Sequence, residues 1–173
     1  MGGDDCQEAG GDHAQRALCG HQQHARTPAP VLGSTRQEVG AKIVVVVGLA
    51  QACLDESLRY AGERRQFGRP ISAFQAIQFK LADMAMEIEL SRLMYYKAAW
   101  LHMQGLPYTK EASMAKLFSS ETAKRCADQA VQIHGGYGFM DEYPVSRYWR
   151  NVKVHEIGEG TSEVQRQIIA KHL

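Results

Sequence analysis

Glu159 is the acidic residue whose neighbours are most suggestive of chemistry. It lies between Gly158 and Gly160, directly before a predicted helix that begins near Thr161 or Ser162. Glycines on both sides leave room for a flat ligand to lie against the carboxylate. A carboxylate in an apolar cleft can act as a general base, whereas the start of a helix favours the ionised form of an ordinary acid. The spacing alone leaves both interpretations open.

A cluster of arginines surrounds an aromatic residue in a connection that contains glycine and proline. Arg64, Arg65 and Arg69 lie close to Phe67 in the sequence. Guanidinium groups beside a ring suit a phosphate or pyrophosphate ligand. The alternative is a solvated loop in which Glu63 forms an ion pair with one of the arginines.

Glycines also follow a predicted long helix, in the segment from Gln132 to Gly138. Backbone without side chains allows a ligand to approach closely, but Gly135 is equally suited to cap the C-terminus of the helix. No strand precedes these glycines, so they do not form a dinucleotide-binding fingerprint. Taken by itself, His134 is expected to be packed or exposed rather than catalytic.

Two further patterns involve polar side chains. Ser72 and Gln75 have the spacing of a capping box at the start of a helix, although Gln75 could instead reach a ligand. A group of cysteines and histidines near the N-terminus matches no common zinc-ligand spacing, so we predict no metal site. Its members are Cys6, His13, Cys19, His21 and His24.

Helical periodicity dominates from Gln37 onward, because apolar residues recur at every third or fourth position. We predict three long helices over about 37–62, 72–105 and 109–134, the last with Thr109 as its N-cap, and a shorter helix near the C-terminus. The segment 144–150 is predicted to be a turn and 154–160 a loop. These elements predict an all-α fold, an up-down four-helix bundle.

Two of the predicted helices have unusual surfaces. The second is apolar around so much of its circumference that it must be covered on more than one side. The third has a face of small residues, which would let another helix approach closely. These small residues are Ala112, Ala115, Ser119, Thr122, Cys126 and Ala130.

Composition limits the classes of protein that this chain can represent. It has 173 residues and a net charge of +1, which gives no support for a nucleic-acid partner. The longest apolar run, Ile43–Val47, is too short to span a membrane. Residues 1–36 lack an apolar period and are expected to be disordered, which leaves 37–173 as the folded domain. We expect no secretion signal, since no apolar core is present, and the acidic residues are unlike a transit peptide.

Four segments of the chain share one family pattern. They are GLAQACLD (48–55), YAGERRQFG (60–68), QIHGGYG (132–138) and IGEGTSEVQ (157–165). In their order and intervals they resemble the acyl-CoA dehydrogenase family over about Val44–Leu173. The resemblance implies the C-terminal helical bundle of such an enzyme, without its N-terminal helical domain and middle β-domain. Val39 stands where the family usually has an arginine that meets the CoA-bearing substrate.

The resemblance also implies a reaction. In this family a glutamate removes the α-proton of an acyl-CoA while a hydride leaves the β-carbon for FAD. The product is a trans-2-enoyl-CoA, and an electron-transfer flavoprotein accepts the electrons. By motif match Glu159 is this base, and Gly160 lies against the acyl-CoA. A branch of the family takes its base from near the position of Glu38, but such members generally lack the acid at the position of Glu159.

Further residues correspond to contacts with FAD. The resemblance implies that Arg64 reaches the pyrophosphate and that Gln75 bonds the cofactor. The resemblance also implies a segment that lies along the adenosine part of FAD, namely Gln132, Ile133, His134, Gly135 and Gly136. The flavin contacts after the base are Thr161, Ser162 and Glu163. Several such contacts reach FAD held by a neighbouring subunit, so the resemblance implies a homodimer or homotetramer.

Two functions of different class follow. The first is an FAD-dependent acyl-CoA dehydrogenase of fatty-acid β-oxidation, in the bacterial cytoplasm or the mitochondrial matrix, with an acyl-CoA oxidase as a close chemical alternative. The second is a non-catalytic helical module that oligomerises or contributes part of an FAD site.

Overall fold

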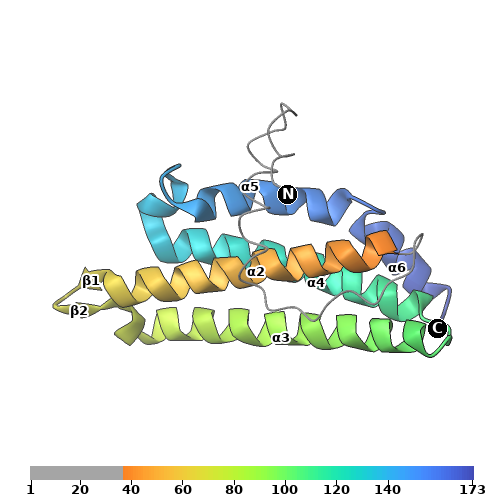
Figure 1. The fold of residues 1–173 in the computed structure, drawn as a ribbon. Coiled ribbons are helices and arrows are strands. Elements are labelled where there is room, and N and C mark those ends of the chain that lie inside the picture. The colour runs from red at the N-terminus through yellow and green to blue at the C-terminus, as the bar shows by residue number, and fades with distance from the viewer. Residues whose placement is uncertain (1–36) are drawn as a thin grey trace, which may run out of the picture.

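The computed structural model describes residues 37–173 (Figure 1). The predictions about residues 1–36, including their disorder and the group of cysteines and histidines, lie outside the described residues. The same holds for the side chains of residues 37–42, among them the alternative base Glu38.

Helices make up most of the described chain, which confirms the predicted all-α fold. They are α2 (Gln37–Glu63), α3 (Gln75–Met103), α4 (Thr109–His134), α5 (Pro144–Ile157) and α6 (Ser162–Ala170). A small antiparallel hairpin, β1 (Arg65–Gln66) and β2 (Arg69–Pro70), follows α2. Two 3-10 turns, η1 (Ile71–Ala73) and η2 (Gly135–Phe139), precede α3 and follow α4.

The four longest helices, α2 to α5, run in alternating directions along a common axis (Figure 1). Helix α4 is in the middle and contacts α2, α3, α5 and α6. Most of its predicted face of small residues is buried inside this single chain, with Ala115, Thr122 and Ala130 essentially inaccessible. The small side chains therefore let the other helices of the same chain approach α4 closely, as the sequence predicted for this face.

Helix α5 corrects two predictions, because the segment expected to be a turn and the first part of the expected loop, 154–157, lie in one helix of 14 residues. Pro144 occupies the first turn of α5, where the missing N–H of a proline removes no helical hydrogen bond. Val145, Tyr148 and Val152 follow at helical spacing and are all buried. The fourth helix of the bundle is thus α5, and the predicted helix near the C-terminus is the short α6.

The start of α3 differs from the predicted capping box. Ser72 lies in η1, and the N-cap of α3 is Phe74, whose side chain forms no capping hydrogen bond. The side-chain amide of Gln78, rather than that of Gln75, reaches back and donates to the carbonyl oxygen of Ser72 at 3.0 Å. The 3-10 turn after Pro70 occupies the residues that the capping box would need.

The two ends of α4 give one wrong and one confirmed prediction. Tyr108 is the N-cap, and Thr109 is already the first helical residue. Gly135 is the C-cap, as one of the two interpretations predicted, and its φ of 59° lies in the left-handed region that favours glycine.

Helix α3 has two apolar stripes, of which one faces the bundle. Met84 and Ile88 are buried, and Ile77 and Leu81 pack partly against the core. Within residues 37–173 the second stripe stays exposed, so a cover on that side of α3 stays a prediction. Its members are Phe79, Met86, Leu90, Leu93 and Trp100.

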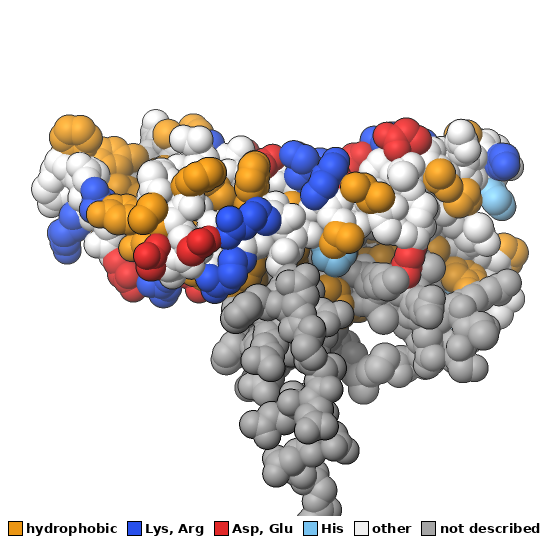
Figure 2. Space-filling model, turned by 90° about the horizontal axis from the view of Figure 1, so that it is seen from above, with side chains coloured by type: hydrophobic (Ala, Val, Ile, Leu, Met, Phe, Trp, Pro, Cys, Tyr) orange, Lys and Arg blue, Asp and Glu red, His pale blue; other side chains and the backbone are white. Residues whose placement is uncertain are grey.

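The surface carries charges of both signs. On the face seen in Figure 2, lysines and arginines alternate with acidic and apolar side chains and no patch of one sign dominates. In the described part of the chain, no helix is long and apolar enough to cross a membrane.

The close packing at Gly138 generates a prediction about stability. A Cβ atom at this position would lie 2.5 Å from the backbone carbonyl oxygen of Val131. We expect Gly138→Ala to lower the free energy of unfolding by about 2 kcal/mol, because backbone must move to accept the methyl group. Urea unfolding followed by circular dichroism measures this. Gly136→Ala is the control, since a Cβ there meets no atom within 4 Å; equal losses in both variants would contradict the steric explanation.

Candidate active site

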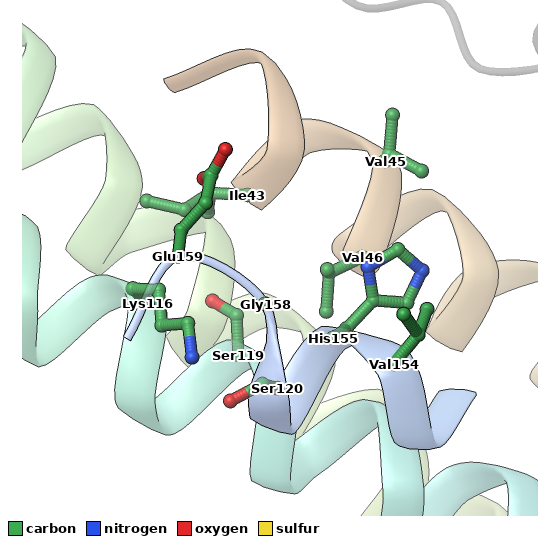
Figure 3. Close-up of a pocket in the computed structure, with 10 residues that line it drawn as sticks. All are labelled: Ile43, Val45, Val46, Lys116, Ser119, Ser120, Val154, His155, Gly158 and Glu159. Atoms are coloured by element: carbon green, nitrogen blue, oxygen red, sulfur yellow. The ribbon is translucent and has the colours of Figure 1, made fainter. Parts of the chain in front are cut away.

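A pocket of about 300 Å³ lies where α5 ends and the chain turns into α6. Its lining residues come from α2, α4, the end of α5 and the loop after it, and include Ile43, Val46, Ser119, Ser120, His155 and Glu159. Figure 3 shows Glu159 at the rim, with its side chain directed toward Ile43 on α2. Its side chain is exposed, so in the described chain this carboxylate lies beside an apolar hollow rather than inside a closed cleft.

The backbone that carries Glu159 is strained. Glu159 has a φ of 58° and Gly160 a φ of 94°, so two consecutive residues adopt left-handed conformations. For a residue with a side chain this conformation costs about 1–2 kcal/mol. A Cβ at Gly160 would lie 2.9 Å from Nε2 of Gln165, the end of a flexible side chain that can shift, so the glycine is required there chiefly for its backbone conformation.

Two side chains that the sequence did not single out as site residues contact this loop. The ammonium group of Lys116 on α4 donates to the carbonyl oxygens of Gly160 at 2.7 Å and of Glu156 at 3.3 Å. The amide of Gln165 on α6 donates to the carbonyl oxygens of Glu159 at 3.1 Å and of Gly160 at 3.3 Å. Neither contact could be predicted from the sequence, because the acceptors are backbone carbonyl oxygens.

The predicted flavin contacts form the turn after Glu159. Thr161 is the N-cap of α6, and its hydroxyl accepts a hydrogen bond from the backbone N–H of Val164. Ser162 is buried and Glu163 is exposed. The Thr161 hydroxyl and the backbone N–H of Glu163 itself lower the pKa of the Glu163 carboxyl below its ordinary value. All three residues therefore lie close to the candidate base.

A second pocket, of about 520 Å³, lies near the other end of α4. It brings together five of the residues predicted to contact FAD, namely Arg64, Ile133, His134, Gly135 and Gly136. Gln132 is exposed next to them at the end of α4, whereas Gln75, in the first turn of α3, is exposed and does not line this pocket.

Of the three clustered arginines, only Arg64 lines this pocket. Its guanidinium lies 5.6 Å from the centre of the Tyr137 ring. Arg69 lies instead over Phe74 at 4.2 Å. The carboxylate of Glu63 pairs with Arg59 on its own helix at 3.2 Å, so the alternative in which Glu63 neutralises the arginine loop is not what the structure contains.

The second pocket has features that fit a dinucleotide. A Cβ at Gly135 or Gly136 would meet no atom within 4 Å, so the backbone there faces open space. An exposed guanidinium beside open backbone suits a pyrophosphate. In residues 37–173, no group of three or more histidine, cysteine or acidic side chains is arranged to hold a metal ion.

His134 is packed, which is one of the two placements expected for it taken by itself. It is 2 % exposed and stacks on Tyr60 with 4.2 Å between ring centres. Its Nδ1 lies 2.8 Å from the carbonyl oxygen of Ala130, and because a carbonyl only accepts, Nδ1 carries the proton. Burial lowers the pKa of this imidazole below 6.5 and so favours the neutral form.

The two pockets are far apart in one chain. Lys116 lines the first and His134 the second, and they are 18 positions apart on α4. At 1.5 Å per residue this separation is about 27 Å. Glu159 and Arg64, which line the two pockets, therefore lie near opposite ends of α4.

Comparison with known proteins identifies the family of this helical domain. The family described as acyl-CoA dehydrogenase, C-terminal domain, matches residues 32–173. The chain belongs to the acyl-CoA dehydrogenase family. Members of this family are FAD-dependent oxidoreductases, and the part represented here is the C-terminal helical domain.

Individual relatives cover the same region of this acyl-CoA dehydrogenase domain. Probable acyl-CoA dehydrogenase YngJ of Bacillus subtilis is 64% identical over 129 residues, which are 75% of this chain and 34% of the relative. The structure of butyryl-CoA dehydrogenase from Megasphaera elsdenii superimposes with a TM-score of 0.77 at 43% identity, over 79% of this chain and 36% of that one.

A third relative comes from a structure reported as the electron transferring flavoprotein of Acidaminococcus fermentans. It matches with a TM-score of 0.76 at 44% identity, over 78% of this chain and 35% of that one. The chain thus spans about a third of the length of the curated relatives it matches.

The buried imidazole generates a prediction about pH dependence. Because the pKa of His134 is lowered in the folded state, the unfolded chain binds this proton at a higher pH. The free energy of unfolding should fall as the pH decreases from about 7.5 to 5.5, with a slope from this residue of at most about 1.4 kcal/mol per pH unit. His134→Phe, which keeps a ring against Tyr60, should flatten that slope in urea unfolding. The exposed His172, changed to Gln, is the control; an unchanged slope in His134→Phe would contradict the assignment.

Proposed function

We propose that this chain forms the base-bearing part of an FAD-dependent acyl-CoA dehydrogenase and that Glu159 is the base. The observation that carries the proposal is the position of Glu159, which is held in a strained backbone conformation at the rim of a pocket. In ordinary loops a residue with this left-handed backbone conformation is usually glycine. A glutamate there is best explained by a use for its carboxylate.

The reaction assigns a definite task to each residue around the base. The carboxylate of Glu159 accepts the α-proton of an acyl-CoA thioester, and FAD, when bound, accepts the hydride from the β-carbon. Gly160 leaves space for the acyl-CoA beside the carboxylate. Because the side chain of Glu159 is exposed, a substrate that arrives from outside the bundle can reach it. The product is a trans-2-enoyl-CoA.

The separation of the two pockets supports a shared arrangement of cofactors. The Arg64 end would hold the pyrophosphate and adenosine part of one FAD, with Gln132, Ile133, His134, Gly135 and Gly136 along it and Gln75 nearby. The Glu159 end would meet the flavin of another through Thr161, Ser162 and Glu163. About 27 Å along α4 separates the ends, so a second copy of the chain would complete each site.

The exposed stripe of α3 supports assembly into a homodimer or homotetramer. Phe79, Met86, Leu93 and Trp100 are each more than half exposed along one side of the helix. A contiguous apolar face of this kind marks a surface that another protein covers. A second copy of this domain is the partner that the proposed shared sites require.

Electron transfer completes the proposed function. An electron-transfer flavoprotein would accept the electrons, as in the family, and the similarity to a chain from the Acidaminococcus fermentans structure supports this partner. We place the activity in fatty-acid β-oxidation, in a bacterial cytoplasm or a mitochondrial matrix.

A second candidate is a non-catalytic module that oligomerises or supplies part of an FAD site. It is favoured by the exposure of Glu159, whose carboxylate is not enclosed by the described residues. Addition of FAD to the purified chain separates the two. A protein that binds flavin and reduces a dye with acyl-CoA is an enzyme by itself, whereas one that stays colourless is the module.

Substitution of the candidate base tests its role. We expect Glu159→Gln to lower dye reduction with acyl-CoA by about a hundredfold to ten-thousandfold, because an amide cannot accept the α-proton. The flavin absorbance of the reconstituted protein should not change. The exposed residue Glu142, changed to Gln, is the matched control. Turnover that survives in Glu159→Gln would show that another group is the base.

Substitution in the second pocket tests the cofactor assignment. Arg64→Ala should raise the dissociation constant for FAD about tenfold to a hundredfold, because a charged hydrogen-bond donor to the pyrophosphate is lost. Titration followed by flavin fluorescence measures this. Arg65→Ala is the control, since Arg65 carries the same charge but does not line the pocket. Equal weakening in both variants would indicate a general charge effect rather than a specific contact.

A further inference from the structure

The loop that carries Glu159 is held from inside the bundle by a buried lysine. Lys116 is 8 % exposed, and its two acceptors lie on either side of the loop. Glu156 belongs to the last turn of α5, and Gly160 directly precedes the N-cap of α6. One ammonium group therefore connects the end of one helix to the beginning of the next.

The end of α5 is a favourable place for this cation. The last carbonyl groups of a helix lack partners within the helix and form the negative end of its dipole. Burial lowers the pKa of Lys116, while the carboxylates of Glu159, Glu156, Glu121 and Glu163 raise it. These four acids lie on α4, α5, α6 and the loop between α5 and α6, whereas the α2 residues of the same pocket, Ile43, Val45 and Val46, are apolar.

Gln165 supports the same loop from α6. It is 6 % exposed, and its amide donates to the carbonyl oxygens of both Glu159 and Gly160. The carbonyl of Gly160 thus accepts from two buried side chains, at 2.7 Å from Lys116 and 3.3 Å from Gln165. Both left-handed residues of the loop have their carbonyl groups fixed by side chains from other parts of the fold.

We propose that Lys116 and Gln165 are positioning residues that hold the Glu159–Gly160 backbone in its left-handed conformation and so aim the Glu159 carboxylate. The effect on turnover rests on the proposed function, whereas the effect on the loop does not. Without these donors the loop can relax to ordinary conformations, and the carboxylate moves away from the pocket rim. A displacement of about 1 Å in a reacting group can cost a hundredfold in rate.

Hydrogen exchange of the chain without cofactor tests the structural part. We expect Lys116→Met and Gln165→Met each to raise the exchange rate of the amides in 158–161 at least about tenfold, while α2 and α3 keep their protection. Lys97→Met and Gln167→Met, at exposed positions on α3 and α6, are matched controls and should change nothing in the loop. If Lys116→Met does not fold, Gln165→Met still gives the result. Unchanged loop exchange in the folded variants overturns the proposal.

Kinetics of the FAD-loaded protein tests the positioning part. Lys116→Met should lower kcat about a hundredfold and leave KM for acyl-CoA and the bound flavin within about threefold of their original values. Lys116→Arg should recover part of kcat, since a guanidinium can again donate to both carbonyls. A rise in KM with unchanged kcat contradicts the positioning role. If the unmodified chain shows no turnover but its loop responds to both substitutions, the proposed function fails and the structural role of the two residues stands.

Discussion

The side chains through which α4 meets its neighbours are small, and this allows α2, α3, α5 and α6 to pack around one central helix. Ala115, Ala123 and Ala127 are fully buried and keep the helix axes close. The same helix carries Lys116 near its beginning and ends at Gly135, so its straight length sets the distance between the two pockets. Larger residues on α4 would push apart the helices that line the two pockets.

Much of the fold follows from local patterns in the sequence. The apolar periods of α2, α3 and α4 gave their approximate limits, and Gly135 marked the end of α4. Helix α5 was missed because Pro144 was interpreted as a turn residue, although the buried positions Val145, Tyr148 and Val152 have helical spacing. Proline is favoured in the first turn of a helix but breaks a helix in its interior. The sequence alone does not show which of these two positions Pro144 occupies.

The candidate site was predictable where one short segment contains several of its residues. The glycines around Glu159 and the segment from Gln132 to Gly136 are such cases, and both lie at pockets. Lys116 is different, because 44 positions separate it from Gly160 and its partners are carbonyl oxygens that every residue possesses. A single lysine in a helix has no motif, so only the packing of α4 against the end of α5 identifies its role.

The left-handed conformation of Glu159 has a consequence for how the sequence of this loop can change. One nucleotide substitution converts either glutamate codon into a glycine codon, and glycine would remove the backbone strain at this position. Selection for stability alone would therefore favour the loss of this side chain. The backbone conformation alone therefore does not favour a glutamate here, and the side chain of Glu159 must be retained by an interaction or a use of its carboxylate.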